Sequence, residues 1–394
     1  MLQRYRPSSE VLTDVGRAFA NLIYYTEKGN LVTTTDLQST QDELFYLDDD
    51  IQNGASPHAT RTIQSFNFTV DNTQLEHQQY SFRRESVTTV SDVALIGEYG
   101  VGVTADSAYL EDLITNSSVE RTAGAIKFTI REHPTLAASS LENRIYGPRR
   151  ETLPTIELGC SLYNKWTNYY HWIIEHLLKL RHVERYEKAV GETPMLIIPP
   201  DPPKYITETL SLLGYSRSDW VVWSDPGIRV DSLVVPTYPE PTPGNLSWLR
   251  SQLQQQVEPA TDEPSRIYIS RDRSDKRLVE NEHEVREVVA EFGFEPYFLE
   301  ELTVEEQVRL FGSADAVVGP HGAGLTNVIW GDDLTVFELF PEDVYDLYGV
   351  ISSLLGHAYH GLQFTSVTPR LGINSNLNVD VDALHSYLDS NLSD

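Results

Sequence analysis

Cationic side chains gather in one short stretch of a chain that is otherwise strongly acidic. The stretch covers residues 266–277 and holds five cations and two anions, whereas the whole chain has a formal charge of −28. Because a guanidinium group binds phosphate oxygens in pairs, we expect a phosphate-bearing ligand here, with Arg271 and Arg277 as its first contacts. The hydroxyl of Ser270 would add a hydrogen-bond donor. The alternative is a solvated turn whose cations pair with acidic neighbours such as Glu282.

A glycine-rich turn follows further along the chain, with the sequence His-Gly-Ala-Gly-Leu-Thr-Asn at residues 321–327. We predict a strand over residues 316–319 before this turn and a helix from Leu325 after it. Strand, glycine turn and helix start form anion pockets in α/β sheets, because the first helical amides and the positive end of the helix dipole face the ligand. Gly322 and Gly324 are small enough to let the backbone approach a phosphate.

Two further side chains complete this candidate site for a phosphate-bearing ligand. His321 is expected to donate a hydrogen bond to phosphate, and its alternative role is to cap the turn through a backbone bond. Glu338 stands near the end of a predicted strand over residues 335–339, where a carboxylate can reach a ribose hydroxyl. Glu282 and Gln307 are additional candidates, although both also suit the surface of a helix. The candidate residues for binding this ligand are Ser270, Arg271, Arg277, His321, Gly322, Ala323, Gly324, Leu325, Thr326, Asn327 and Glu338.

A histidine and a glutamate stand one helical turn apart in an earlier part of the chain. Residues 170–186 carry apolar side chains at helical spacing, and His171 and Glu175 share one face of the predicted helix. A carboxylate beside the ring can orient it and raise its basicity, so His171 is our candidate for the catalytic base and Glu175 is the next. His171 could instead be a packed helix-start residue. The spacing also suits two metal ligands, but no third ligand stands nearby, and we expect no metal site.

The patterns around these residues predict an α/β protein of several parts. Residues 151–260 and 261–372 each alternate short apolar strands with helices, which is typical of two Rossmann-like lobes with parallel sheets. Residues 1–150 are expected to form a β-rich N-terminal extension, in which residues 123–133 read as a strand. Residues 373–394 are expected to form a C-terminal helix.

Together these segments resemble the family 61 glycosyltransferases, which include plant xylosyl- and arabinosyltransferases, animal O-linked N-acetylglucosaminyltransferases and prokaryotic enzymes linked to surface polysaccharides. The blocks that carry the resemblance are NYYHWIIEHL from Asn168, IYISRDRSDKR from Ile267, NEHEV from Asn281, EEQVRLFGSADAVVGPHGAGLTN from Glu305 and FEL from Phe337. The resemblance implies a GT-B-like pair of Rossmann-like lobes, inversion at the anomeric carbon, and no essential metal or other cofactor. It implies a nucleotide-diphosphate sugar as donor and a glycan or lipid-linked glycan as acceptor, as in the building of a surface polysaccharide.

The composition indicates the setting in which the protein works. The 394 residues include 58 acidic and 30 basic side chains, and arginine outnumbers lysine. An acidic, lysine-poor surface stays soluble where salt screens charge, so we expect a halophilic prokaryote as the source and no nucleic acid as a partner. The sequence shows no signal-peptide core and no apolar run of about 18 residues, which predicts a cytoplasmic protein with at most peripheral association at the inner face of the membrane. Cys160 is the only cysteine, so no disulfide forms within the chain.

Two other classes of protein compete with the glycosyltransferase hypothesis. One is a non-catalytic protein that retains the same fold and binds nucleotides or glycans. The other is a Rossmann oxidoreductase, which is disfavoured because no GxGxxG motif follows an early strand and the glycines of ALIGEYGVGV have the wrong spacing. Hydrolysis of a UDP- or GDP-sugar by the purified protein would separate the enzyme from the non-catalytic binder.

Overall fold

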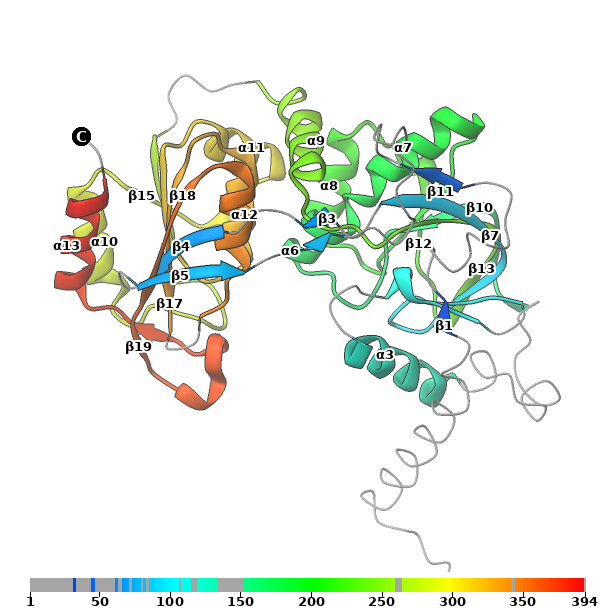
Figure 1. Ribbon diagram of the computed structural model, residues 1–394, viewed down its shortest axis with the longest axis horizontal. Helices are drawn as coiled ribbons and strands as arrows, with labels where there is room; N and C mark the ends of the chain where they lie inside the picture. The colour runs from blue at the N-terminus through cyan, green and yellow to red at the C-terminus, as the bar shows by residue number, and fades with distance from the viewer. Residues whose placement is uncertain are drawn as a thin grey trace, which may run out of the picture.

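The computed structural model describes residues 31–32, 44–46, 61–62, 66–70, 73–78, 81–82, 85–105, 108–114, 119–133, 152–258, 264–341 and 344–392. Figure 1 shows two β-sheets side by side along the long axis of the molecule, with helices packed against both. We call the sheets the first and the second sheet, and the elements around each of them the first and the second half. Parallel strands connected by helices dominate both halves, so the predicted α/β class is confirmed.

The first sheet is built on four parallel strands in the order β13, β10, β11, β12. Their bounds are Gly227–Pro236 (β13), Thr155–Ser161 (β10), Met195–Ile198 (β11) and Trp220–Val222 (β12). Beyond β13 the sheet continues antiparallel through β7 (Ser86–Ile96), β8 (Val101–Val103) and β9 (Tyr109–Leu110). Two short strands lie at its edges: β1 (Leu31–Val32) pairs with β9, and β2 (Leu44–Tyr46) pairs with β7. The helices α8 (Lys204–Leu212) and α9 (Pro243–Gln254) belong to this half, as do the short η3 (Glu111–Leu113) and η6 (Arg217–Asp219).

The helical segment that carries the candidate base begins at the boundary between the two halves (Figure 1). It comprises α6 (Tyr169–His171), the π-helical turn η5 (Trp172–His176) and α7 (Lys179–Val190). The side chain of Asn168 caps its start by accepting a hydrogen bond from the backbone N–H of His171 at 3.2 Å. Gly191 ends the segment in the left-handed conformation, with φ 83°. The helix predicted over residues 170–186 is confirmed, with a π-helical turn that the sequence did not indicate.

The second sheet has the strand order β15-β14-β16-β17-β18-β4-β5, and all neighbours are parallel except the hairpin β4-β5. The bounds are β15 (Glu295–Tyr297), β14 (Arg266–Ile269), β16 (Ala316–Pro320), β17 (Thr335–Phe340), β18 (Ala358–Gln363), β4 (Phe66–Val70) and β5 (Thr73–Gln78). The strands predicted at residues 316–319 and 335–339 are therefore confirmed, and each extends one residue further. The remaining short elements are η7 (Leu299–Glu301), η9 (Pro369–Asn374), β19 (Thr365–Ser366) and β20 (Leu377–Asn378).

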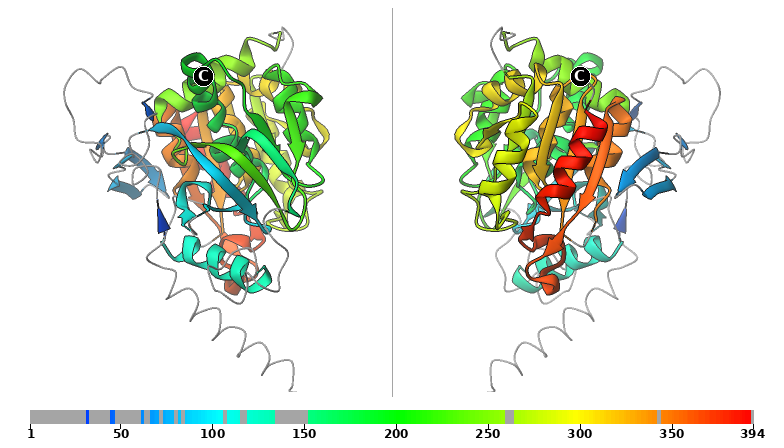
Figure 2. Two further views of the ribbon diagram at one scale, coloured as in Figure 1. Left: turned by 90° about the vertical axis from the view of Figure 1, so that its right-hand side faces the viewer. Right: turned by 90° about the vertical axis from the view of Figure 1, so that its left-hand side faces the viewer.

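Helices cover both faces of the second sheet. On the outer face lie α10 (Glu282–Glu291) and α13 (Val381–Asn391), as the right-hand view of Figure 2 shows. On the other face lie α11 (Val304–Gly312), α12 (Leu347–Leu355) and η8 (Ala323–Trp330). The helix predicted after the glycine turn is present as η8, a 3₁₀ helix. Because side chains alternate along β17, Phe337 packs toward α10 and α13 whereas Val336 and Glu338 face α12.

The N-terminal region is β-rich in part, and its strands extend both sheets. The hairpin β4-β5 joins the second sheet while β7 to β9 join the first, and β3 (Arg61–Thr62) pairs with β6 (Ser81–Phe82). The strand predicted over residues 123–133 is wrong, because this segment lies in the helix α3 (Val119–Glu132) and the residue after it. The buried side chains of this helix recur at spacings of three and four: Thr122, Ala125, Ile126, Thr129 and Ile130. The alternation that suggested a strand is only part of this helical pattern.

The two halves pack directly against each other. One hydrophobic cluster includes Trp172 from the first half and Trp330 and Tyr348 from the second. Two side chains of α9 donate across the boundary to carbonyl oxygens of η8: Arg250 Nε to Ile329 and Gln254 Nε2 to Trp330, both at 2.7 Å. The segment at α6 is thereby held next to the glycine turn of the second half. No helix in the described part of the chain is both long and apolar enough to cross a membrane.

Candidate functional site

Two arginines converge on the glycine turn. The loop after β14 and the loop after β16 meet because the two strands are parallel neighbours whose carboxyl ends share one edge of the sheet. Arg277 Nη1 donates to the carbonyl oxygen of His321 at 3.4 Å, and its Nη2 donates to Asn374 Oδ1 at 3.1 Å. Arg271 passes so close to Gly322 that a Cβ added to this glycine would lie 2.5 Å from Nη1. The structure thus brings together Arg271, Arg277, His321 and Gly322, as the sequence predicted.

Other cations of the same stretch have partners elsewhere. Arg266 Nη1 donates to the carbonyl oxygen of Phe292 at 2.7 Å. Arg273 forms an ion pair with Glu301, and its guanidinium lies 4.0 Å from the centre of the Phe298 ring. The basic stretch is therefore not one uniform patch, and Arg271 and Arg277 are the arginines that line the turn.

Arg271 and Arg277 lack a direct ion pair within the described part of the chain, although nearby carboxylates (Glu300 and Glu282 for Arg271, Glu338 for Arg277) favour their charged forms. Neither guanidinium forms an ion pair with a described carboxylate, and the Nε atoms of both are buried without a hydrogen bond. Burial lowers the pKa of both guanidinium groups, and the charge of Arg277 adds to the lowering at Arg271. Arg277 also has a left-handed backbone with φ 59°, which costs free energy for a residue with a side chain. Partly buried cations without a direct ion pair, together with local strain, are features of a site that is completed by an anion.

The backbone of the turn provides further donors. The amide of Leu325 donates to the carbonyl oxygen of Gly322 at 3.0 Å, so it is used inside the turn. The amides of Ala323 and Gly324 make no hydrogen bond to other described residues. Gly324 also has to lack a side chain for packing, since a Cβ would lie 3.0 Å from Leu299 Cδ1. The donors that remain for a ligand are therefore one residue nearer the strand than the sequence suggested.

The end of the motif joins the two halves. Leu325, Thr326 and Asn327 are fully buried. Asn327 Oδ1 accepts a hydrogen bond from Tyr169 Oη of α6 at 2.7 Å, and its Nδ2 donates to Gln307 Oε1 at 2.8 Å. Asn327 and Gln307 thus hold α6 against η8, and their side chains have their hydrogen-bonding groups occupied by protein.

Glu338 and Ser270 are likewise bound to other protein groups. Glu338 is fully buried, and its two oxygens accept from His321 Nδ1 and Tyr359 Oη, each at 2.5 Å. Ser270 Oγ donates to Glu282 Oε1, and burial, the largest influence, raises the pKa of this glutamate. Glu282 forms no direct ion pair with the cations of the basic turn, although its charge still favours the cationic form of Arg271.

The candidate base has a similar arrangement in the first half. His171 Nδ1 lies 2.8 Å from Glu175 Oε2 in an ion-pair contact that lacks hydrogen-bond geometry, and Tyr238 Oη donates to the same oxygen at 2.6 Å. Burial by itself would raise the pKa of Glu175, but the nearby ring and charge of His171 and the hydroxyl of Tyr238 outweigh it, so the pKa is lowered. Glu175 therefore stays ionised beside the ring. The neighbouring His176 is fully buried and neutral, because burial lowers its pKa to about 3.

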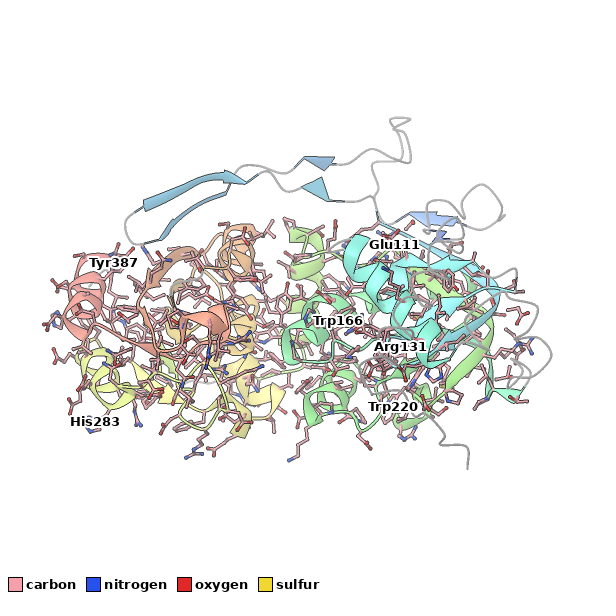
Figure 3. The ribbon with its side chains drawn as sticks, turned by 90° about the horizontal axis from the view of Figure 1, so that it is seen from below. Glu111, Arg131, Trp166, Trp220, His283 and Tyr387 are labelled. Atoms are coloured by element: carbon pink, nitrogen blue, oxygen red, sulfur yellow. The ribbon has the colours of Figure 1, made fainter. Side chains whose placement is uncertain are left out.

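Aromatic rings connect the two groups of candidate residues across the boundary. The ring of Tyr170 lies 5.3 Å from that of His171 and 6.0 Å from that of Tyr348, and the ring of Tyr348 lies 5.6 Å from that of His321. Trp166, seen near the middle of the molecule in Figure 3, lies 6.5 Å from His171 on the same side of the boundary. The base candidate and the glycine turn thus belong to one region where the halves meet.

The comparison with protein families agrees with this geometry. Residues 169–337 match the family model described as Glycosyltransferase 61. This region belongs to glycosyltransferase family 61. Members are enzymes of class EC 2.4, which move a sugar from a donor to an acceptor. Among curated proteins the chain has no significant match.

The family region contains most of the candidate residues but not all of their partners. It begins at Tyr169 in α6 and ends at Phe337, one residue before Glu338. The tyrosines that hold the two glutamates, Tyr238 and Tyr359, were not singled out from the sequence. Tyr238 follows the end of β13 by two residues, so the rule that sites gather at the carboxyl ends of strands was the signal available for it.

Metal ligands are not gathered in the described part of the chain. No group of three or more histidine, cysteine, aspartate and glutamate side chains there has the geometry to hold a metal ion. Three consecutive aspartates at residues 48–50, whose carboxylates are of a type that binds metal ions, lie outside the described residues. Independence from metal remains an expectation that chelation would test.

Gly322→Ala is expected to weaken binding of a nucleoside diphosphate about tenfold without unfolding the protein. The new Cβ would lie 2.5 Å from Arg271 Nη1, the far end of a flexible side chain, so the guanidinium moves and the fold survives. Gly319→Ala is the matched control, because its Cβ would lie 2.9 Å from Ile269 Cβ in the core. We expect that control to lower the melting temperature instead. Equal nucleotide affinity of Gly322→Ala and the parent would contradict the placement of Arg271 at the ligand.

Proposed function

We propose that the protein is an inverting glycosyltransferase of the GT-B type, which moves a sugar from a nucleotide-diphosphate sugar to a surface polysaccharide or other glycan. The observation that carries this proposal is the pair of partly buried guanidinium groups of Arg271 and Arg277, which lie on the glycine turn without a direct ion pair to a described carboxylate. A diphosphate supplies the charge that such a pair lacks. Membership of family 61 supports sugar transfer as the reaction.

In this proposal each half binds one of the two substrates. We assign residues 261–372 to the nucleotide-sugar donor and residues 151–260 to the acceptor, with residues 1–150 and 373–394 as additions to this pair of lobes. The donor assignment is supported by the arginines and the turn in the second half. The acceptor assignment is supported by the position of His171 in the first half, close to the boundary. For the acceptor we propose a glycan, free or linked to a lipid, and for the setting the cytoplasm or the inner face of the membrane.

The chemistry follows from the placement of charge. We assign the proton of a neutral His171 ring to Nδ1, which lies 2.8 Å from the ionised Glu175, so that Nε2 can accept the proton of the acceptor hydroxyl. The acceptor oxygen forms its bond to the anomeric carbon as the bond from that carbon to the phosphate oxygen breaks. The electron pair leaves with the diphosphate, whose charge is stabilised by Arg271, Arg277 and the free turn amides. Attack opposite to the leaving group inverts the anomeric carbon.

Turnover of sugar nucleotides tests the proposal. The purified protein would be incubated in molar salt with UDP- and GDP-sugars, with and without oligosaccharide acceptors, and release of the nucleoside diphosphate would be measured. Thermal shift with each nucleotide would identify the donor, because a ligand that binds the native state raises the melting temperature. Binding without any turnover would favour the non-catalytic alternative. Absence of both would reject the proposed function.

Activity is expected to persist in EDTA. Cationic side chains and backbone amides would stabilise the departing diphosphate, so removal of divalent ions should leave kcat within about twofold of its value without chelator. The measurement is the initial rate of nucleoside diphosphate release with EDTA and with added manganese. Complete loss on chelation and recovery with manganese would contradict metal independence and would direct attention to the acidic residues 48–50.

A further inference from the structure

The same set of three side chains occurs once in each half. In the first half it is His171, Glu175 and Tyr238, and in the second it is His321, Glu338 and Tyr359. In both sets the histidine turns Nδ1 to a carboxylate that also accepts a hydrogen bond from a tyrosine hydroxyl. The first set surrounds the proposed base. The second set lies beside Arg277 at the proposed diphosphate site, and proton transfer to an acceptor does not explain it.

The sheet fixes the carboxylate of the second set. Glu338 in β17 is opposite Gly361 of β18, and Tyr359 is opposite Val336, so Tyr359 and Glu338 lie on the same face two positions apart. Burial, followed by the charge of Glu338, raises the pKa of Tyr359 far above the ordinary value, so this hydroxyl remains a donor. One oxygen of Glu338 is thus occupied by Tyr359, and the other is held against His321.

Packing fixes the ring of His321. It stacks on Phe340 with centroids 5.5 Å apart and planes at 26°, and the ring of Tyr348 lies 5.6 Å away. The exposed ring of Tyr345 lies 6.0 Å from it. The backbone amide of His321 donates to the carbonyl oxygen of Leu339 at 2.9 Å. With Nδ1 on Glu338, the other ring nitrogen, Nε2, is the one left for a ligand, and it makes no hydrogen bond to a described residue.

We propose that His321 binds the diphosphate as an imidazolium, and that Glu338 and Tyr359 are the residues that position it for this role. On donor binding, the Nε2 lone pair takes a proton from solvent and the new N–H donates to a phosphate oxygen. When the diphosphate leaves, the proton returns to solvent. This inference rests on the proposed function, because it needs a diphosphate at the glycine turn.

The charges around the ring favour such a switch. On the Nδ1 side lies the carboxylate of Glu338, and the guanidinium groups of Arg277 and Arg271 lie at the same turn and oppose a third positive charge. The hydroxyls of Tyr348 and Tyr359 stay neutral, because burial raises the pKa of both. Among the described residues, the phenol of Tyr345 is a further titratable group beside the ring. A bound diphosphate adds negative charge at the turn, which stabilises the imidazolium between two anions.

The direction of proton exchange distinguishes this role from simple phosphate contact. A terminal phosphate has a pKa of about 6, so a site made of arginines and amides alone would favour its fully ionised form and release protons on binding. Protonation of His321 has the opposite sign. Near neutral pH, we therefore expect net proton uptake when a nucleoside diphosphate binds.

Calorimetry of UDP and GDP binding at one pH, in buffers with different ionisation enthalpies, measures this exchange. The parent is expected to take up protons, and His321→Gln is expected to release them and to bind about tenfold more weakly. His385→Gln is the matched control, since His385 is an exposed histidine of the same half that pairs with Glu291 at 3.4 Å. It should keep the parental uptake. Glu338→Gln and Tyr359→Phe, checked for folding by thermal unfolding, are expected to reduce the uptake, which a purely structural role would leave unchanged.

The outcomes separate the inference from the proposed function. If the parent binds neither nucleotide, the function proposed above is wrong and the inference falls with it. If the parent binds a nucleotide while releasing protons, or if His321→Gln retains the uptake, the diphosphate site stands and the imidazolium is overturned. If His321→Gln loses the uptake but Glu338→Gln and Tyr359→Phe retain it, the positioning roles of Glu338 and Tyr359 are wrong.

Discussion

His171→Ala is expected to lower kcat by about 10²- to 10⁴-fold, the usual contribution of a positioned general base. The ring lies beside an ionised carboxylate that is itself held by Tyr238, so its position depends on the protein. Affinity for the nucleotide should change little, because the proposed phosphate contacts are in the second half. The measurements are kcat and KM for the identified donor, and Kd for its nucleoside diphosphate.

The α10 helix offers a matched control for this variant. His283 Nδ1 lies 3.7 Å from Glu287 Oε1 at the same four-residue spacing, but both side chains are exposed, and Figure 3 shows His283 at the edge of the molecule. His283→Ala is therefore expected to leave kcat unchanged. Parental turnover of His171→Ala would eliminate this residue as the base and make Glu175 the next candidate. A tenfold loss of nucleotide affinity would instead place this helix against the donor.

The sequence predicted those elements whose apolar side chains follow a clear local pattern. The strands at residues 316–319 and 335–339 were found because apolar runs end at a glycine turn or a proline. The helix at residues 170–186 was found because its apolar side chains have a clear period. The helix α3 was missed because Ile126 and Ile130 fit an alternating pattern as well as a helical one. Packing of α3 beside β8, which local sequence does not reveal, decides between the two.

The part of the candidate site that two short loops supply was predictable. Arg271 and Arg277 are brought to His321 by two neighbouring strands, a geometry that strand and turn patterns anticipate. The tyrosines were not predictable, because Tyr238 reaches Glu175 across 63 residues, and Tyr359 reaches Glu338 through the register of two strands. The role of Glu338 changed for the same reason. Its place at the end of a strand suggested a ribose contact, whereas burial and two hydrogen bonds favour a positioning role.

Arg271→Ala and Arg277→Ala are each expected to weaken binding of a nucleoside diphosphate by about 1.5–3 kcal/mol, the contribution of a hydrogen bond to a charged group. Since each guanidinium is partly buried and lacks a carboxylate in the described part of the chain, its removal leaves no protein anion unpaired. The melting temperature without ligand should therefore not fall. Loss of affinity with retained stability is the expected signature of a binding residue, measured by calorimetry and thermal unfolding.

Two further variants of the same turn sharpen this test. Arg273→Ala is the matched control, because Arg273 is engaged by Glu301 and Phe298 and should leave nucleotide affinity unchanged. Arg277→Lys keeps the positive charge but loses the planar fork, so we expect an affinity between those of the parent and Arg277→Ala. If Arg273→Ala weakened binding as much as Arg271→Ala and Arg277→Ala, the turn would act only through its overall charge. Parental affinity in both Arg271→Ala and Arg277→Ala would show that the diphosphate binds elsewhere, because no other pair of described arginines lies on the glycine turn.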